Sequence, residues 1–371
     1  MRFTVFACAF LVVVAGSALF VGVALHLSKT WEPDVYVGVY AGSTNVEELV
    51  NLADEVKSYT NLFVVGSFQV VEELPKLNQV CQRLAENGLN FLIFSHPNET
   101  VPFAQWVRDA QRNWGAQFLG LYAYDEVGGH QIDRTRWMAI HAADNYTDAA
   151  EKYAVAVHDW LDQLRNYSGA DLPMYASDYV LYEYDYRAGY DAVFAQFGWN
   201  FSRPLHVALC RGAATMNGKP WGAIITWTFD TPPYLESGQR VYEDMVYAYQ
   251  SGAKYILVFD FDENTTRGIL QQEHLDALKR FWQYAEEHPR ASSPPENRVA
   301  YVLPSGYGYG FRGPADKIWG LWEADGLSGK VWGDVVRLSE QYVSGLDIIY
   351  EDNLQPNASP YSQLVFWNGT S

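Results

Sequence analysis

The sequence predicts an α/β fold: a (β/α)8 TIM-like barrel, followed by a small α/β unit and preceded by a membrane-spanning helix. Short apolar runs and helical patterns alternate eight times between residues 30 and 288. The runs are apolar throughout, so both of their faces need cover, which is typical of parallel strands. A span of about 255 residues also matches a closed eight-stranded barrel. A doubly wound open sheet is the alternative, with fewer strands at more variable spacing.

The predicted strands are rich in Val, Ile, Phe and Tyr, as in Val-Tyr-Val-Gly-Val-Tyr at residues 35–40. Apolar residues at helical spacing predict the helices between them, and Gly88 ends the second helix. The strands cover residues 35–40, 62–65, 90–94, 118–124, 173–176, 192–197, 223–228 and 255–259. The helices cover residues 45–58, 71–87, 101–114, 133–166 with a break near Asp144 and Asn145, 204–215, 240–250 and 273–287.

A linker rich in Pro and Ser, residues 289–296, separates the barrel from a smaller unit at residues 297–371. Strands are predicted in this unit at 298–303, 346–350 and 364–367, with a helix at 332–342. The unit is too small to build a large core of its own. We therefore expect it to pack against the barrel.

The N-terminal segment, residues 1–29, predicts a membrane anchor. Residues 3–27 include no Asp, Glu, Lys or Arg, and their number is about what a helix needs to cross the hydrocarbon core. A cleaved signal peptide, which would make the protein secreted, is the alternative. Asn-x-Ser/Thr tripeptides are spread over the rest of the chain and indicate an extracytoplasmic glycoprotein. They begin at Asn98, Asn145, Asn166, Asn200, Asn264, Asn357 and Asn368.

Composition argues against several partners and cofactors. A net charge of -18 repels nucleic acid, so we expect no nucleic-acid partner. Cys8, Cys81 and Cys210 have no metal-ligand spacing, and no metal is expected. Cys81 and Cys210 are interpreted as buried free thiols, with a disulfide as the alternative. Residues 308–313 match Gly-x-Gly-x-x-Gly, a pattern of dinucleotide-binding sites. Such a site needs a helix that begins at the last Gly, but Pro314 follows here. We therefore expect an aromatic loop that lies against the barrel, and no cofactor.

Carboxylates follow several predicted strands, at the end of a barrel where active sites lie. Asp125 and Glu126 come directly after the fourth strand, and Asp178, Asp230 and Asp260 follow the fifth, seventh and eighth. Any one of these carboxylates, taken alone, is more often a helix cap or a solvated loop residue. Together they indicate glycosidic-bond chemistry, which commonly uses two carboxylates that flank the bond.

Aromatic residues gather at the same strand ends and predict a lining for sugar rings. The candidates for substrate binding are Tyr40, His96, Tyr124, Asp178, Tyr179, Trp199 and Trp227. The alternative, expected for about half of these rings, is that they pack in the hydrophobic core and do not contact a ligand. Arg211, on the helix predicted at residues 204–215, is expected to form a structural ion pair.

The Tyr124-Asp125-Glu126 turn resembles that of barrel glycoside hydrolases, many of which place an acid/base Glu after an Asn or Asp at the end of strand four. This resemblance implies an acid/base role for Glu126. In the best-known clan a Glu ends strand seven, whereas here the strand ends Trp-Thr-Phe-Asp and the next Glu is Glu236. The small C-terminal unit also looks like appendages of some β-galactosidase-like enzymes.

The sequence therefore predicts a membrane-anchored, extracytoplasmic glycoside hydrolase with a carbohydrate substrate. Glu126 would donate the proton, Asp230 or Asp260 would act as nucleophile or base, and Asp125 would tune Glu126. One alternative is a non-catalytic surface or envelope protein that binds glycans on the same scaffold. A different lyase or hydrolase chemistry in the same barrel mouth is a third hypothesis.

Overall fold

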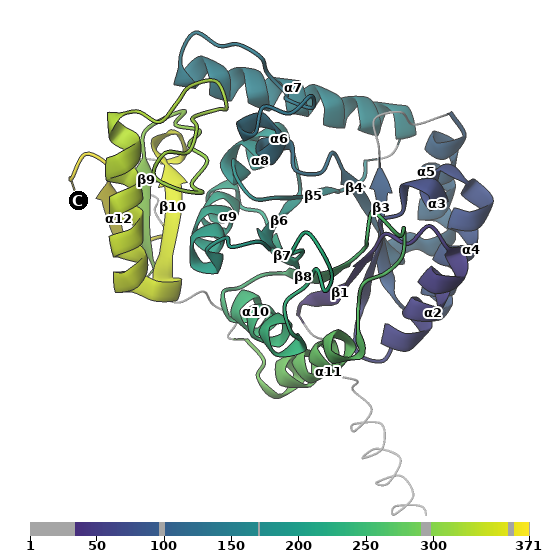
Figure 1. Ribbon diagram of the computed structural model, residues 1–371. Coiled ribbons are helices and arrows are strands. Elements are labelled where there is room, and N and C mark those ends of the chain that lie inside the picture. The colour runs from purple at the N-terminus through teal and green to yellow at the C-terminus, as the bar shows by residue number, and fades with distance from the viewer. Residues whose placement is uncertain (1–33, 96–100, 170, 291–297, 355–359, 371) are drawn as a thin grey trace, which may run out of the picture. The chain divides into compact units, whose positions relative to one another are not determined.

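Eight parallel strands close into a barrel in the computed structural model, which describes residues 34–95, 101–169, 171–290, 298–354 and 360–370 (Figure 1). Each strand pairs with its neighbours in sequence, and the first pairs with the last, from Tyr36 opposite Tyr255 to Ala41 opposite Asp260. The closed ring confirms the predicted barrel and excludes the open doubly wound sheet.

The eight predicted strands are all present, and all except β2 and β6 have shifted ends. The largest shift is in β7, which ends at Ile225, three residues before the predicted end, because Thr226 and Trp227 turn into the loop that follows. The strands are β1 (Tyr36–Ala41), β2 (Leu62–Val65), β3 (Asn90–Ser95), β4 (Phe118–Ala123), β5 (Met174–Asp178), β6 (Ala192–Phe197), β7 (Trp221–Ile225) and β8 (Tyr255–Asp260).

Helices surround the strands, and most lie where apolar periodicity places them. They are α2 (Val46–Val56), α3 (Phe68–Glu72), α4 (Leu74–Glu86), α5 (Val101–Trp114), α6 (Val127–Ile132), α7 (Tyr146–Ser168), α8 (Tyr182–Ala188), α9 (Arg203–Asn217), α10 (Gly238–Gln250) and α11 (Gln272–Glu287). The predicted helix 71–87 is two helices that meet at Glu73, since Pro75 is tolerated only in the first turn of α4. The sequence did not predict α6 and α8, which are too short to show a period.

The helix predicted at residues 133–166 begins later in the structure than in the prediction. Residues 133–145 form a loop, and α7 begins only at Tyr146. The side chain of Asn145 caps α7 by accepting a hydrogen bond from the Asp148 backbone N–H at 3.0 Å. This loop becomes part of the wall around the barrel mouth.

The C-terminal unit is a three-stranded parallel sheet with one long helix. Its elements are β9 (Val299–Leu303), α12 (Gly326–Tyr342), β10 (Leu346–Tyr350) and β11 (Gln363–Phe366), and the strand order is β10-β9-β11. The helix starts six residues before the predicted 332, where the Asp325 side chain accepts hydrogen bonds from the Leu327 and Ser328 backbone N–H groups. The sheet lies beside α9, and a Cβ added to Gly212 would meet the Ile348 carbonyl oxygen at 2.3 Å (Figure 1).

A buried ion cluster joins this sheet to the barrel. The Asp347 carboxylate accepts hydrogen bonds from Arg211 Nε at 2.7 Å and from an Arg298 guanidinium nitrogen at 2.9 Å. The Arg211 guanidinium also donates to the Ser344 and Leu346 carbonyls. The structural ion pair predicted for Arg211 is confirmed.

Other sequence predictions have mixed outcomes. Cys81 and Cys210 are buried free thiols, as predicted, and Cys8 lies outside the described residues. Among the residues that the structure describes, no helix is both long enough and apolar enough to cross a membrane. The anchor predicted at residues 1–29 lies outside them and stays a prediction.

Replacing Asp347 by Ala is expected to lower the free energy of unfolding by about 3–5 kcal/mol, because two buried guanidinium groups lose their partner. Urea titration of the purified protein measures this change. Glu86→Ala is the matched control, since it removes a carboxylate whose pair with Arg83 is half exposed. The control should cost less than about 1 kcal/mol, and similar losses in both variants would show that the cluster is not a strong link.

Candidate active site

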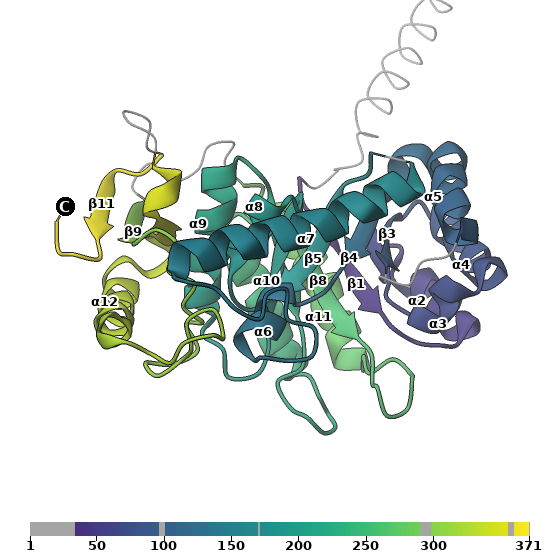
Figure 2. The ribbon, with the colours of Figure 1, turned by 90° about the horizontal axis from the view of Figure 1, so that it is seen from above.

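A cleft of about 750 Å³ opens at the carboxyl ends of the barrel strands. Figure 2 shows α6 and the loops after β7 and β8 at this same end of the barrel. Carboxylates, two amides and several aromatic rings share the lining. It is formed by Tyr122, Asp125, Glu126, His130, Asp133, Ser177, Tyr179, Gln196, Trp199, Asn200, Phe201, Ile224, Thr226, Trp227, Phe259, Glu263 and Arg312.

The turn after β4 holds two residues in the left-handed region. Tyr124 has φ of 52° and Glu126 has φ of 55°, on either side of Asp125. Side chains with a Cβ adopt this region at a cost of about 1–3 kcal/mol each, and such strain gathers at functional sites. The Glu126 backbone N–H donates to the Ser177 carbonyl at 2.9 Å, which fixes the turn against β5.

Asp125 is held by three hydrogen bonds to one carboxylate oxygen. Its Oδ1 accepts from the Tyr122 hydroxyl at 3.0 Å, the Ser177 backbone N–H at 3.1 Å and the Ser177 hydroxyl at 2.8 Å. Burial and then repulsion from the Glu126 charge raise the pKa of Asp125 to about 7. The buried Asp125 carboxyl therefore resists ionisation more than a solvent-exposed one does.

Glu126 points to the end of β6, where Gln196 Nε2 donates to its Oε1 at 2.6 Å. Burial raises the pKa of Glu126, and the hydrogen bond from Gln196 opposes that rise. The charges of Asp133 and Glu263 raise this pKa further. A carboxyl whose pKa is raised and that faces a cleft is suited to act as a general acid.

Sequence analysis missed Gln196 and Ser177, which position both carboxyls. Gln196 Nε2 donates to the Ser177 hydroxyl at 2.9 Å as well as to Glu126, so the ends of β4, β5 and β6 share one network. A polar residue inside the apolar run of β6 was the available signal. A weaker indication for Ser177 was its position one residue before Asp178, the carboxylate that ends β5.

Three of the predicted sugar-binding rings line the cleft. Trp199 is 38% exposed, and Trp227 stacks on Tyr234 with ring centroids 5.5 Å apart. Tyr179 stacks on Phe201 at 5.5 Å, and its hydroxyl donates to Asp133 at 2.6 Å. These contacts hold the rings at the wall while leaving aromatic surface toward the cleft.

Two predicted catalytic carboxylates do not line the cleft. Asp230 is exposed in the loop after β7, where nothing in the structure gives it a part in the cleft. Asp260 is buried, and its Oδ1 accepts hydrogen bonds from the Ile269 and Leu270 backbone N–H groups. Its carboxylate therefore folds the loop after β8, which agrees with a structural role better than a catalytic one.

Two residues that were predicted to bind substrate, Tyr40 and Asp178, instead have structural roles. Tyr40 is buried in the barrel core, with its ring centroid 5.1 Å from that of Tyr122. Asp178 is buried and accepts hydrogen bonds from the Gly128 and Gly129 backbone N–H groups at 2.6 and 3.0 Å, at the start of α6.

The remaining two binding candidates lie elsewhere. Tyr124 faces a neighbouring pocket, where its hydroxyl donates to the Trp160 carbonyl at 3.3 Å. His96 lies outside the described residues.

The C-terminal unit adds a cation to the cleft. Arg312, in the loop between β9 and α12, donates to Asp133 and to both carboxylate oxygens of Asp316. This loop is the Gly-x-Gly-x-x-Gly segment, which lies against the barrel as predicted. Sequence patterns gave no sign that Arg312 reaches the barrel mouth.

The fold resembles that of solved carbohydrate-active proteins at low sequence identity. A GH5_18 variant from Bifidobacterium longum subsp. longum, in complex with Manb1-4GlcNAc, matches with a TM-score of 0.53 and 10% identity, over 90% of this chain and 96% of that chain. A β-galactosidase from the Antarctic haloarchaeon Halorubrum lacusprofundi matches with a TM-score of 0.58 and 12% identity, over 90% and 69% of the two chains. No protein-family model matches the chain, and no curated protein matches it in sequence.

A second pair of buried acids, Asp178 and Asp185, lies on β5 and α8. Asp185 on α8 accepts a hydrogen bond from the Tyr153 hydroxyl at 2.8 Å, and its burial raises its pKa to about 7. Burial, and then the Asp185 charge, raise the pKa of Asp178 as well. Asp178 also caps α6, the helix that carries the cleft residue His130.

Asp185→Asn is expected to make stability less dependent on pH. The native pKa of Asp185, about 7, lies above the usual value of about 4, so the folded protein holds the extra proton and loses stability as pH rises between these values. The variant keeps an acceptor for Tyr153 but cannot ionise. Relative to wild type, its free energy of unfolding should rise by on the order of 3 kcal/mol between pH 4 and pH 8.

Urea titrations across this pH range provide the measurement. Asp230→Asn, at an exposed position, is the control and should follow the wild-type curve. If the free energy of unfolding of Asp185→Asn changed with pH in the same way as that of wild type, the raised pKa of Asp185 would be refuted.

Proposed function

We propose that the protein hydrolyses glycosidic bonds in a carbohydrate bound at the barrel mouth. The observation that carries this proposal is the Asp125–Glu126 turn, where a strained backbone holds two adjacent carboxyls in a cleft beside aromatic rings. The fold likeness supports it, since the matched proteins include one named a β-galactosidase and one in complex with Manb1-4GlcNAc.

Glu126 is the proton donor in this proposal. Burial raises its pKa, which favours the protonated carboxyl, and the Gln196 amide holds it toward the cleft. As the bond from the sugar carbon to the glycosidic oxygen breaks, the Glu126 proton moves to that oxygen. Water supplies the hydroxyl that ends on the sugar carbon and the proton that restores Glu126.

Glu263 is the best-placed second carboxylate. It lines the cleft, is exposed to solvent and lies close enough to Glu126 for its charge to raise the Glu126 pKa. Asp260 is engaged by backbone N–H groups, and Asp230 lies outside the lining. Glu263 would activate a water or attack the sugar carbon itself, depending on its separation from Glu126.

Aromatic rings supply the sugar contacts in the proposed site. Trp199 and Trp227 offer flat apolar faces, and Asn200 and Asp133 offer hydrogen-bonding groups for hydroxyls. Such a mixture is typical of ligand clefts. Residues 1–29 would anchor the enzyme on the extracytoplasmic side of a membrane, a proposal that the seven Asn-x-Ser/Thr tripeptides support.

A non-catalytic glycan-binding protein is the second candidate. The observation in its favour is at β7, where the cleft receives Ile224, Thr226 and Trp227 but no carboxylate. Binding on a carbohydrate array without any hydrolysis product would select this candidate.

Glu126→Gln is expected to reduce kcat on a hydrolysed glycan by about 10²–10⁴-fold, since the amide cannot donate the proton. Glycan binding should persist, because the amide keeps the shape of the carboxyl. Turnover on a polysaccharide panel and binding by calorimetry measure the two effects. Glu263→Gln should also lose turnover, whereas Asp230→Asn should retain it; full activity in Glu126→Gln would remove this residue from the mechanism.

Asp133→Asn is expected to shift the pH profile of kcat/KM. Activity should fall as pH rises through the Glu126 pKa, because only the protonated carboxyl donates. The Asp133 charge raises the Glu126 pKa, so removing that charge should lower this pKa and move the alkaline limb to lower pH. An alkaline limb that stays in place, measured against wild type in the same buffers, would show that the Asp133 charge does not tune Glu126. The tuning of Glu126 by Asp125 stays a prediction.

A further inference from the structure

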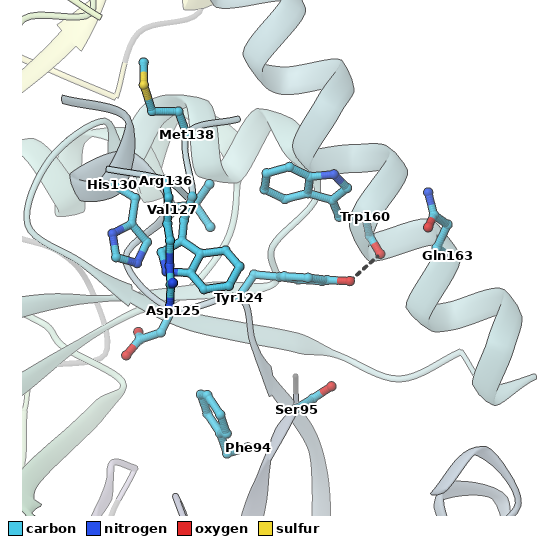
Figure 3. Close-up of a pocket in the computed structure, with 11 residues that line it drawn as sticks. Phe94, Ser95, Tyr124, Asp125, Val127, His130, Arg136, Met138, Trp160 and Gln163 are labelled. Carbon is cyan, nitrogen blue, oxygen red and sulfur yellow. Dashed lines mark hydrogen bonds between the residues drawn. The ribbon is translucent and has the colours of Figure 1, made fainter. Parts of the chain in front are cut away.

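A second pocket, of about 550 Å³, lies beside the cleft and has a different chemical character (Figure 3). It is bounded by the ends of β3 and β4, the loop at residues 133–145, and α7. Most of its lining is aromatic or aliphatic: Phe94, Tyr124, Val127, Trp137, Met138 and Trp160. Its volume is in the range of pockets that take small ligands.

The rest of the lining is polar or charged: Ser95, Asp125, His130, Arg136 and Gln163. The Tyr124 hydroxyl, which Figure 3 shows directed at α7, donates to the Trp160 carbonyl at 3.3 Å. The Arg136 guanidinium carbon lies 4.6 Å from the Trp137 ring centroid. The pocket therefore offers a ligand mainly carbon surface, in contrast to the carboxylates and amides of the cleft.

Trp137 is the most telling member of the lining. Its side chain is 48% exposed, on a loop that brings it to the pocket wall. Exposed large apolar side chains that cluster around a concave surface mark interaction sites. An apolar group seated in the pocket would cover this ring.

The pocket adjoins the cleft, because Asp125 and His130 line both cavities. A ligand in the cleft that reaches these two residues therefore also reaches the edge of the pocket. We infer that the pocket binds an apolar group of the same ligand, and that the protein takes glycosides with an alkyl or aryl aglycone. The sugar part of this inference rests on the proposed function, whereas the apolar site does not.

Photoaffinity labelling with 4-methylbenzophenone tests the pocket without a sugar. The full chain is reconstituted in lipid nanodiscs, irradiated with the probe and digested, and mass spectrometry then maps the labelled peptides. Labels are expected on the peptides that include residues 124–138 and 160–163. Phenyl β-D-glucoside should compete with the probe, and methyl β-D-glucoside should not.

Trp137→Ser is expected to reduce this labelling about tenfold, since the ring supplies apolar contact area. Met138→Glu, which places a charge in the pocket, should have a similar effect. Phe229→Ser is the matched control, because Phe229 is 42% exposed and lies in the loop after β7. The control should label as wild type does.

The outcomes separate the two proposals. Wild-type protein without label at these peptides, or equal labelling in Trp137→Ser and Phe229→Ser, would overturn the apolar site even if glycans are hydrolysed. Conversely, specific labelling in a protein that neither binds nor cleaves any glycan would uphold the pocket and refute its assignment to an aglycone.

Discussion

The hydrogen-bond network at the ends of β4, β5 and β6 is the constraint on which the cleft depends. Ser177 binds Asp125 through both its backbone N–H and its hydroxyl, and Gln196 joins Ser177 to Glu126. A strained turn with two adjacent carboxyls persists only where its surroundings determine it fully. Parallel pairing of three successive strands provides this, because it sets their last residues side by side.

The C-terminal unit contributes to the cleft as well as to the fold. Arg312 reaches the barrel mouth and pairs with Asp133, which also accepts the Tyr179 hydroxyl. The ion cluster around Asp347 attaches the same unit to α9. The unit thus balances part of the negative charge that four lining carboxylates bring to the cleft, and its attachment matters for the site.

The barrel could be predicted from sequence because the signal repeats, whereas the site depended on contacts between distant residues. Apolar runs at regular spacing located all eight strands, and the turn after β4 stood out by its two acids. Position after a strand could not distinguish Glu263, which lines the cleft, from Asp260, whose carboxylate folds a loop. Gln196 and Arg312 gain their roles only when strand pairing and the C-terminal loop bring them to Glu126 and Asp133.

The close approach of α9 to β10 leaves no room for a side chain where the C-terminal unit meets the barrel. At Gly212 the helix backbone lies so near the Ile348 carbonyl that a single added carbon would sit 2.3 Å from its oxygen. Any other residue at position 212 would therefore push α9 away from β10. The packing of the C-terminal unit on the barrel thus depends on one absent side chain as well as on the Asp347 ion cluster.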